Sequence, residues 1–237
     1  MLNRMAYTAL FTALALMIGV LLYWRVEIIS LGGPVMIPIV MCSVFSLAIV
    51  FERGWYFFQL HMGKDIEAFF DRLRATVEKH QWKDAQTLCE SWPGPVGRVA
   101  LAGLAVHESA PQEIDDTMTQ AAHEELPAVE KHLRWLSTLA QVSTLLGLLG
   151  TVTGLVRAFQ VIQRKSGASG TAVNPGDLAG GVWEALITTV AGLVIAIPTI
   201  LAYNYFAARL GEVQFHMEKA AGIISSWRHR RGTASCD

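Results

Sequence analysis

Two stretches of the sequence carry small and hydroxyl side chains along one face of a helix. In the first, steps of three and four residues place seven small or polar side chains on the same face: Ser137, Ala140, Thr144, Gly147, Thr151, Gly154 and Ala158. In the second, the same steps connect Ala185, Thr189, Gly192, Ala196 and Thr199. Small residues alone allow helices to pack closely, but a hydroxyl can also line a path for an ion. The threonines therefore make these faces candidates for an ion pathway.

The two stretches contain no titratable group near their middle. Asp, Glu, His and Lys are absent from Trp135–Val156 and Ala185–Ala208. Arg157 and Glu184 lie at the ends of these runs, where a long side chain can also reach the membrane surface. A chain that moved protons unaided would need a titrating group within the membrane. If protons cross here, a carboxylate must come from another polypeptide.

The composition predicts helices that cross a membrane. The 237 residues are 52% hydrophobic and 16% charged, and four runs lack charge altogether: Met5–Trp24, Ile28–Phe51, Trp135–Val156 and Ala185–Ala208. Each run approaches or exceeds the roughly 20 residues that a helix needs to span the hydrocarbon layer. We expect an all-α membrane protein with three core transmembrane helices, an additional N-terminal span and long cytoplasmic helical extensions. A cleaved signal peptide is the alternative for the first run, but no small-residue cleavage site follows it.

The sequence divides into alternating membrane and polar segments. The predicted segments are an N-terminal anchor (1–27), a first core span (28–58), a helical region (59–134), a pore-lining span (135–163), a loop (164–181), a second pore-lining span (182–208) and a C-terminal helix with a basic tail (209–237). In the helical region, Pro111 begins a piece that only Pro127 interrupts before the next span. Two sets of apolar residues recur at helical spacing and predict an apolar stripe on a helix: Ile66, Phe69, Phe70, Leu73 and Val77, and Val213, Met217, Ala220, Ile224 and Trp227.

Basic residues near the spans predict the orientation. Five of them follow the last span: Arg209, Lys219, Arg228, Arg230 and Arg231. The positive-inside rule places this end in the cytoplasm, together with region 59–134, and loop 164–181 in the periplasm. Arg164 and Lys165 oppose this assignment, but they are fewer.

Other classes of function lack support in the sequence. Cys42, Cys89 and Cys236 are far apart without a CxxC motif, so we predict neither a disulfide framework nor a zinc site. A P-loop, a GxGxxG motif and a nucleophile elbow are absent, as is a basic patch interleaved with aromatic residues. We therefore expect no enzymatic activity, no cofactor and no nucleic-acid partner.

Three motifs resemble the MotA/TolQ/ExbB proton-channel family, and its ExbB/TolQ branch most closely. They are GGPVMIPIVMCSVFSLAIVFERG (Gly32–Gly54), LLGLLGTVTGLVRAF (Leu145–Phe159) and EALITTVAGLVIAIPTILAYN (Glu184–Asn204). The last two are long and specific, and the order and spacing of all three agree with the family. The additional span at Met5–Trp24 departs from the three-span pattern of the ExbB/TolQ branch and is nearer to the MotA layout.

The resemblance implies a bacterial inner-membrane subunit that forms a pentamer around two single-span partners of the ExbD/TolR type, each carrying a membrane aspartate. By motif alignment, the pore-facing threonines of the family fall on Thr151 and Thr189, and its glutamate falls on Glu184. Thr144 and Thr188 are further predicted pathway residues, and Gly147, Gly150, Gly154, Gly192 and Pro198 are predicted to serve helix packing. The transported ion is expected to be H⁺, with Na⁺ as the other possibility, and a TonB/TolA-like protein is a possible further partner.

Several functions remain open within this resemblance. A motor subunit could drive TonB-dependent uptake, outer-membrane maintenance or a related envelope process. A flagellar stator of the MotA type is one alternative, and a non-conducting membrane scaffold is another.

Overall fold

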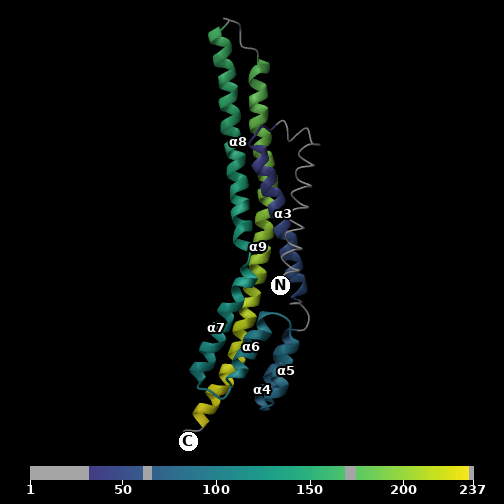
Figure 1. The fold of residues 1–237 in the computed structure, drawn as a ribbon, viewed down its shortest axis with the longest axis vertical. Helices are drawn as coiled ribbons and strands as arrows, with labels where there is room; N and C mark the ends of the chain where they lie inside the picture. The colour runs from purple at the N-terminus through teal and green to yellow at the C-terminus, as the bar shows by residue number, and fades with distance from the viewer. Residues whose placement is uncertain (1–31, 61–65, 169–174, 235–237) are drawn as a thin grey trace, which may run out of the picture. The chain divides into compact units, whose positions relative to one another are not determined.

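The computed structural model describes residues 32–60, 66–168 and 175–234, in which short turns connect helices and no strand is present (Figure 1). The predicted anchor at 1–27 lies outside these described residues. The chain divides into two compact units. The first consists of Met1–Arg53 with His132–Tyr205, and the second of Gly54–Lys131 with Phe206–Asp237.

The membrane prediction is confirmed by the described helices. Three segments are long and apolar enough to cross a membrane: Met36–Gln59, Pro111–Lys165 and Leu178–Trp227. They overlap all three predicted core spans, the first of them from Met36 onward. Helix α8 (Leu133–Ala168) and helix α9 (Pro175–Ala234) both extend into the range 164–181 that the sequence analysis assigns to a loop. The protein is therefore an all-α membrane protein with longer helices than the sequence indicates.

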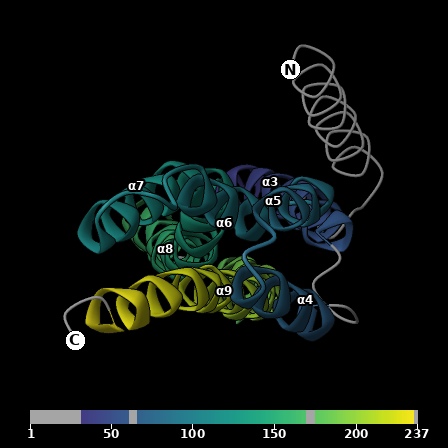
Figure 2. The same cartoon turned by 90° about the horizontal axis from the view of Figure 1, so that it is seen from below.

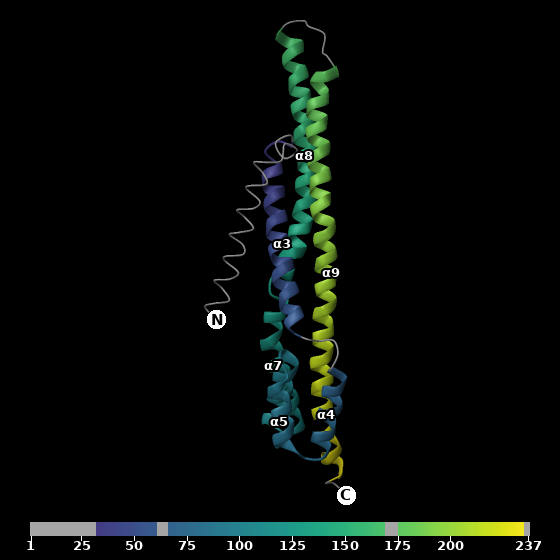
Figure 3. The ribbon, with the colours of Figure 1, turned by 90° about the vertical axis from the view of Figure 1, so that its right-hand side faces the viewer.

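In the first unit, the part of helix α3 (Met36–Gln59) up to Arg53, helix α8 and the first part of helix α9 lie side by side (Figures 1 and 3). Small side chains are buried between them: Ala140, Ser143, Ala158, Ala185, Thr188 and Ala196. Large apolar side chains are exposed on the outside: Leu145, Leu148, Val152, Leu186, Val190 and Leu193. This arrangement suits helices surrounded by lipid or by other helices, because close packing rather than the exclusion of water holds such helices together.

Glu52 and His132 connect α3 to the start of α8. Helix α7 (Pro111–Glu130) continues through Pro127, so the break that the sequence analysis expects at this proline comes later, at Lys131 and His132. His132 has a left-handed φ of 66°. Its Nδ1 donates a hydrogen bond of 2.8 Å to Glu52 Oε2. The contact helps to hold a backbone conformation that is unfavourable for a side chain with a Cβ atom.

The second unit has a conventional apolar core. It contains helices α4 (Ile66–Glu78), α5 (Trp82–Ser91), α6 (Pro95–Ala105) and α7, together with the final part of α9 (Figure 2). Both predicted apolar sets are confirmed, since all ten side chains are buried in this core. Trp82 of α5 contacts Trp227 of α9, with ring centroids 4.6 Å apart. The apolar residues of α9 therefore pack against the shorter helices of this unit.

Charged and thiol groups of the second unit have structural roles. Arg98 pairs with Glu125, and this hydrogen-bonded contact raises the pKa of Arg98. Lys219 donates a hydrogen bond of 2.8 Å to Glu67, which lowers the pKa of that carboxyl. Burial raises the pKa of the Cys89 thiol to about 12. Cys89 therefore stays protonated at neutral pH and acts as a packing residue.

His216 makes the second unit sensitive to mild acid. Its imidazole packs against Phe70, and its Nδ1 is buried without a hydrogen-bond partner. Burial first, and then the charge of Lys219, lowers the pKa of His216, while Glu212 and Glu67 oppose the shift. In the folded state the pKa is thus below that of the unfolded chain, so the unfolded state binds more protons. The stability that neutral His216 contributes is complete above about pH 6.5 and decreases as the pH falls below it.

We expect hydrogen exchange of the α4 amides, corrected for intrinsic rates, to accelerate between about pH 7 and about pH 5.5 in the purified protein. His216→Phe should remove this acceleration, because a phenyl ring can pack on Phe70 without binding a proton. Glu67 does not cause pH dependence in this range. Its pKa is lowered in the folded state, so the stability that it contributes is complete above its ordinary pKa of 4.5 and decreases only below that value. The same acceleration in His216→Phe would show that another group is responsible.

Candidate functional site

Helices α8 and α9 touch through their backbones. A Cβ atom added at Gly192 of α9 would lie 2.6 Å from the Ser143 carbonyl oxygen and 3.0 Å from Gly147 Cα of α8. One added at Gly154 would lie 2.7 Å from Ala185 Cβ and 2.8 Å from the Gly181 carbonyl oxygen. These distances are too short for any side chain other than hydrogen. Glycine at these positions therefore brings the two helices into direct contact.

The Thr189 hydroxyl crosses this contact. Its Oγ1 lies 2.9 Å from the Gly147 carbonyl oxygen of α8 and 3.3 Å from the Ala185 carbonyl oxygen of its own helix. It can donate its one proton to either carbonyl. The side chain is half-buried, so the lone pairs of the oxygen remain available at the edge of the helix pair. The hydroxyl thus connects the helices and presents an acceptor at the same time.

Thr144 and Thr151 lie on α8 beside the packed face. Thr144 is exposed and Thr151 is half-buried. Each hydroxyl donates to a carbonyl of its own helix, Thr151 to Leu148 at 2.6 Å and Thr144 to Ala140 at 3.1 Å. Both side chains are accessible in a single subunit, and their oxygens can accept a hydrogen bond from a neighbouring group.

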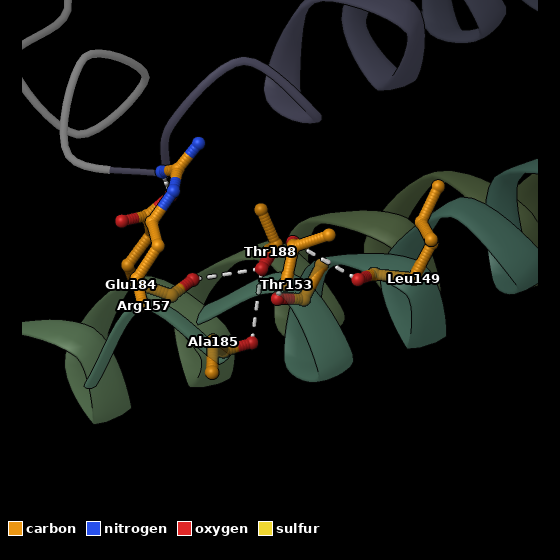
Figure 4. A network of polar contacts seen from close by, with 7 residues as sticks. Leu149, Thr153, Arg157, Glu184, Ala185 and Thr188 are labelled. Carbon is orange, nitrogen blue, oxygen red and sulfur yellow. Dashed lines mark hydrogen bonds and ion pairs between the residues drawn. The ribbon is translucent and has the colours of Figure 1, made fainter. Parts of the chain in front are cut away.

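Thr188 differs from its neighbour Thr189 because it is fully buried. Its side chain occupies the space that a Cβ atom at Gly150 would need, and a Cβ at Gly32 would lie 3.4 Å from its methyl carbon. Its hydroxyl donates to the Glu184 carbonyl at 2.7 Å or to the Ala185 carbonyl at 2.9 Å, as Figure 4 shows. In a single subunit this is the geometry of a packing residue. A place for Thr188 in the ion pathway stays a prediction.

Pro198 lies inside α9, which continues on both sides of it. Its side chain is exposed, whereas Ala196 and Thr199 beside it are buried. Any packing role of Pro198 would therefore involve a neighbour beyond the residues that the structure describes.

Arg157 and Glu184 form an ion pair between α8 and α9. The Arg157 Nη1 donates to Glu184 Oε1 (Figure 4). Spacing within one helix does not reveal this pair, because the two residues are 27 positions apart and lie on different helices. The only signal available was that both lie at the ends of adjacent charge-free runs. Their opposite charges satisfy one another where each alone would be costly in an apolar environment.

The described parts of α8 and α9 therefore present hydroxyls along their contact and charge at one end. A proton relay needs groups that take up and release protons, and threonine hydroxyls do not titrate in this range. This arrangement can line a path or orient a carboxylate from another chain.

Comparisons with known proteins identify relatives of the chain. A model of the MotA/TolQ/ExbB proton channel family matches residues 91–219. The chain is 33% identical over 195 residues to the putative biopolymer transport protein ExbB-like 1 of Synechocystis sp., covering 77% of this chain and 75% of the relative. It is 28% identical over 194 residues to the biopolymer transport protein exbB1 of Vibrio cholerae, covering 80% and 82%. Identity to the Tol-Pal system protein TolQ of Haemophilus influenzae is 36% over 97 residues, covering 41% and 40%.

Proposed function

Because the chain belongs to the MotA/TolQ/ExbB proton channel family, we propose that it is the proton-channel subunit of an ExbB/TolQ-like motor. In this role it couples the proton motive force to work at the cell envelope. The relatives named for biopolymer transport and for the Tol-Pal system favour the ExbB/TolQ branch over a flagellar stator.

The observation that carries the proposal is the placement of hydroxyls beside a contact that has no titratable group near its middle. Thr189 and Thr151 lie on adjacent helices with side chains that are only half-buried, and within the part of the chain that the structure describes neither hydroxyl contacts an acidic side chain. A proton-carrying carboxylate supplied by another chain would find hydrogen-bond partners here. Glu184 lies at one end of the same helix pair.

The proposed assembly takes its stoichiometry from the family resemblance and its partner from the need for a carboxylate. Five copies surround two single-span partners of the ExbD/TolR type in the bacterial inner membrane, and each partner contributes a membrane aspartate. The second unit and the C-terminus lie in the cytoplasm, as the basic residues after the last span indicate. Protonation and deprotonation of the aspartate beside Thr151 and Thr189 step the partner relative to the ring. A TonB/TolA-like protein then transmits the motion to the envelope.

Proton flux through the assembled complex tests the two threonines. The chain would be co-expressed with the single-span protein of its neighbouring reading frame and reconstituted in liposomes under an imposed potential. We expect Thr151→Val and Thr189→Val each to lower the flux about tenfold, because losing one hydrogen bond worth up to about 1.4 kcal/mol in the rate-limiting step has that effect.

Thr153→Val is the matched control for this experiment. Thr153 lies on α8 close to Thr151, and its hydroxyl likewise donates to carbonyls of its own helix, those of Leu149 and Gly150. Normal flux in all three variants would exclude the assigned pathway. An assembly that forms without any carboxylate-bearing partner would favour a scaffold. Dependence of the flux on the sodium gradient would show that the transported ion is Na⁺.

A further inference from the structure

The Arg157–Glu184 pair lies between two close contacts of α8 and α9. Ala158 follows Arg157 in the chain, and a Cβ atom added at Gly181 would lie 2.7 Å from the Ala158 Cβ. Ala185 follows Glu184, and it is the residue against which Gly154 packs. Because small residues bring the backbones together on both sides of the pair, the arginine and the carboxylate emerge at the same level.

The start of the first span covers the same pair. Gly33 precedes α3, has a φ of +66°, and has no side chain to displace its neighbours. A Cβ atom at Gly33 would overlap the Glu184 carboxylate and would lie 2.8 Å from Arg157 Nη1. The ion pair is therefore held against helices α8 and α9 and the backbone that leads into α3.

The two partners differ in how far they are enclosed. The Glu184 side chain is 19% exposed and the Arg157 side chain is 43% exposed. The guanidinium remains charged under all physiological conditions, and its planar donors fix the direction in which a carboxylate points. Arginine thus neutralises the enclosed carboxylate and also determines where it points. A side chain that only reached for the membrane surface would have no need of this geometry.

We propose that Arg157 is the positioning residue for Glu184, and that the two form a neutral pair at one end of the ion pathway. This inference rests on the proposed function, because it gives Glu184 its place beside the path. Without Arg157, the carboxylate is free to turn and the end of the helix pair carries a net negative charge. Arg157 therefore acts on ion flux through Glu184 and has no separate effect.

A double-mutant cycle in the complete complex tests this dependence. Proton flux would be measured for Arg157→Gln, Glu184→Gln and the double variant. We expect Arg157→Gln to lower the flux at least fivefold when Glu184 is present and less than twofold when residue 184 is glutamine. Arg157→Lys should recover part of the lost flux, because it restores the charge without the planar donors. Equal effects of Arg157→Gln in both backgrounds would overturn the inference.

Arg164→Gln is the control, because Arg164 is an exposed arginine further along α8 and its replacement should leave the flux unchanged.

A second readout separates this inference from the proposed function. The thermal midpoint of the purified protein reports the pair whether or not ions flow, and the same cycle should show non-additive shifts. The proposed function would be rejected if proton flux stayed normal in Thr151→Val, Thr189→Val and Glu184→Gln. Non-additive shifts of the thermal midpoint in the same experiment would still show that Arg157 positions Glu184. Lowered flux in the threonine variants, with additive effects in the cycle, would reject only the role of Arg157.

Discussion

Gly192→Leu is expected to separate α8 from α9 and to prevent the protein from accumulating in a folded form. At Gly192 the obstacle is backbone, because the nearest atoms to an added Cβ are the Ser143 carbonyl oxygen at 2.6 Å and Gly147 Cα at 3.0 Å. Backbone atoms cannot rotate away as a flexible side chain can. Overpacking typically costs about 1–3 kcal/mol, and we expect the upper end of this range here, which is a large part of the stability of a typical domain. The thermal midpoint and the yield of monodisperse protein in detergent would measure the effect.

Gly211→Leu is the matched control, because Gly211 lies on the same helix with no atom within 4 Å of an added Cβ. Replacing this glycine should leave the thermal midpoint unchanged or raise it, since glycine is a poor helix former. Gly192→Ala should fall between Gly192→Leu and the wild type. Equal midpoints for Gly192→Leu and Gly211→Leu would show that α8 and α9 do not pack through Gly192.

Gly33→Ala is expected to disturb the first unit for two separate reasons. The backbone at Gly33 has a φ of +66°, which costs a residue with a Cβ about 1–2 kcal/mol. The added Cβ would also overlap the Glu184 carboxylate and force the ion pair apart. The variant should therefore lower the thermal midpoint and reduce proton flux together.

The two causes can be separated by removing the pair. In an Arg157→Ala, Glu184→Ala background, Gly33→Ala should lose the overlap and keep only the cost of the backbone conformation. Gly54→Ala is the control on α3, because an added Cβ at Gly54 meets no atom within 4 Å and should be tolerated. If Gly33→Ala has the same effect in both backgrounds, the loop before α3 does not rest on the ion pair.

The face that α8 turns toward α9 shows how far a periodic pattern can be interpreted. Helical spacing predicts that Thr144, Gly147, Thr151 and Gly154 lie on one face. In an ideal helix Gly150 and Thr151 lie about 60° and about 40° to either side of Gly147, so both are compatible with that face. The structure buries Gly150 and leaves Thr151 half-buried. Periodicity locates the face, but the partner helix decides where its centre lies.

Thr188 and Thr189 show the same limit on α9. Adjacent residues of a helix differ by about 100° in direction, so only one of the two can point fully into the contact. The structure places Thr188 inside, in the space left by Gly150, and Thr189 at the edge, where it donates to Gly147. Their side chains are identical, so composition alone could not distinguish a packing threonine from an accessible one.

The sequence by itself determined the class of the protein, the three described spans, the buried faces of α4 and α9, and the absence of a titratable group near the middle of the two narrow helices. These properties depend on residue type and on spacing within one helix, which a linear sequence records directly. Only the tertiary structure decided the break at His132, the burial of Thr188 and the pairing of Arg157 with Glu184. Each of these features depends on contacts between residues that are far apart in the sequence. Such contacts form only where the backbones fit together, as at Gly154 and Ala185, which bring α8 and α9 into contact.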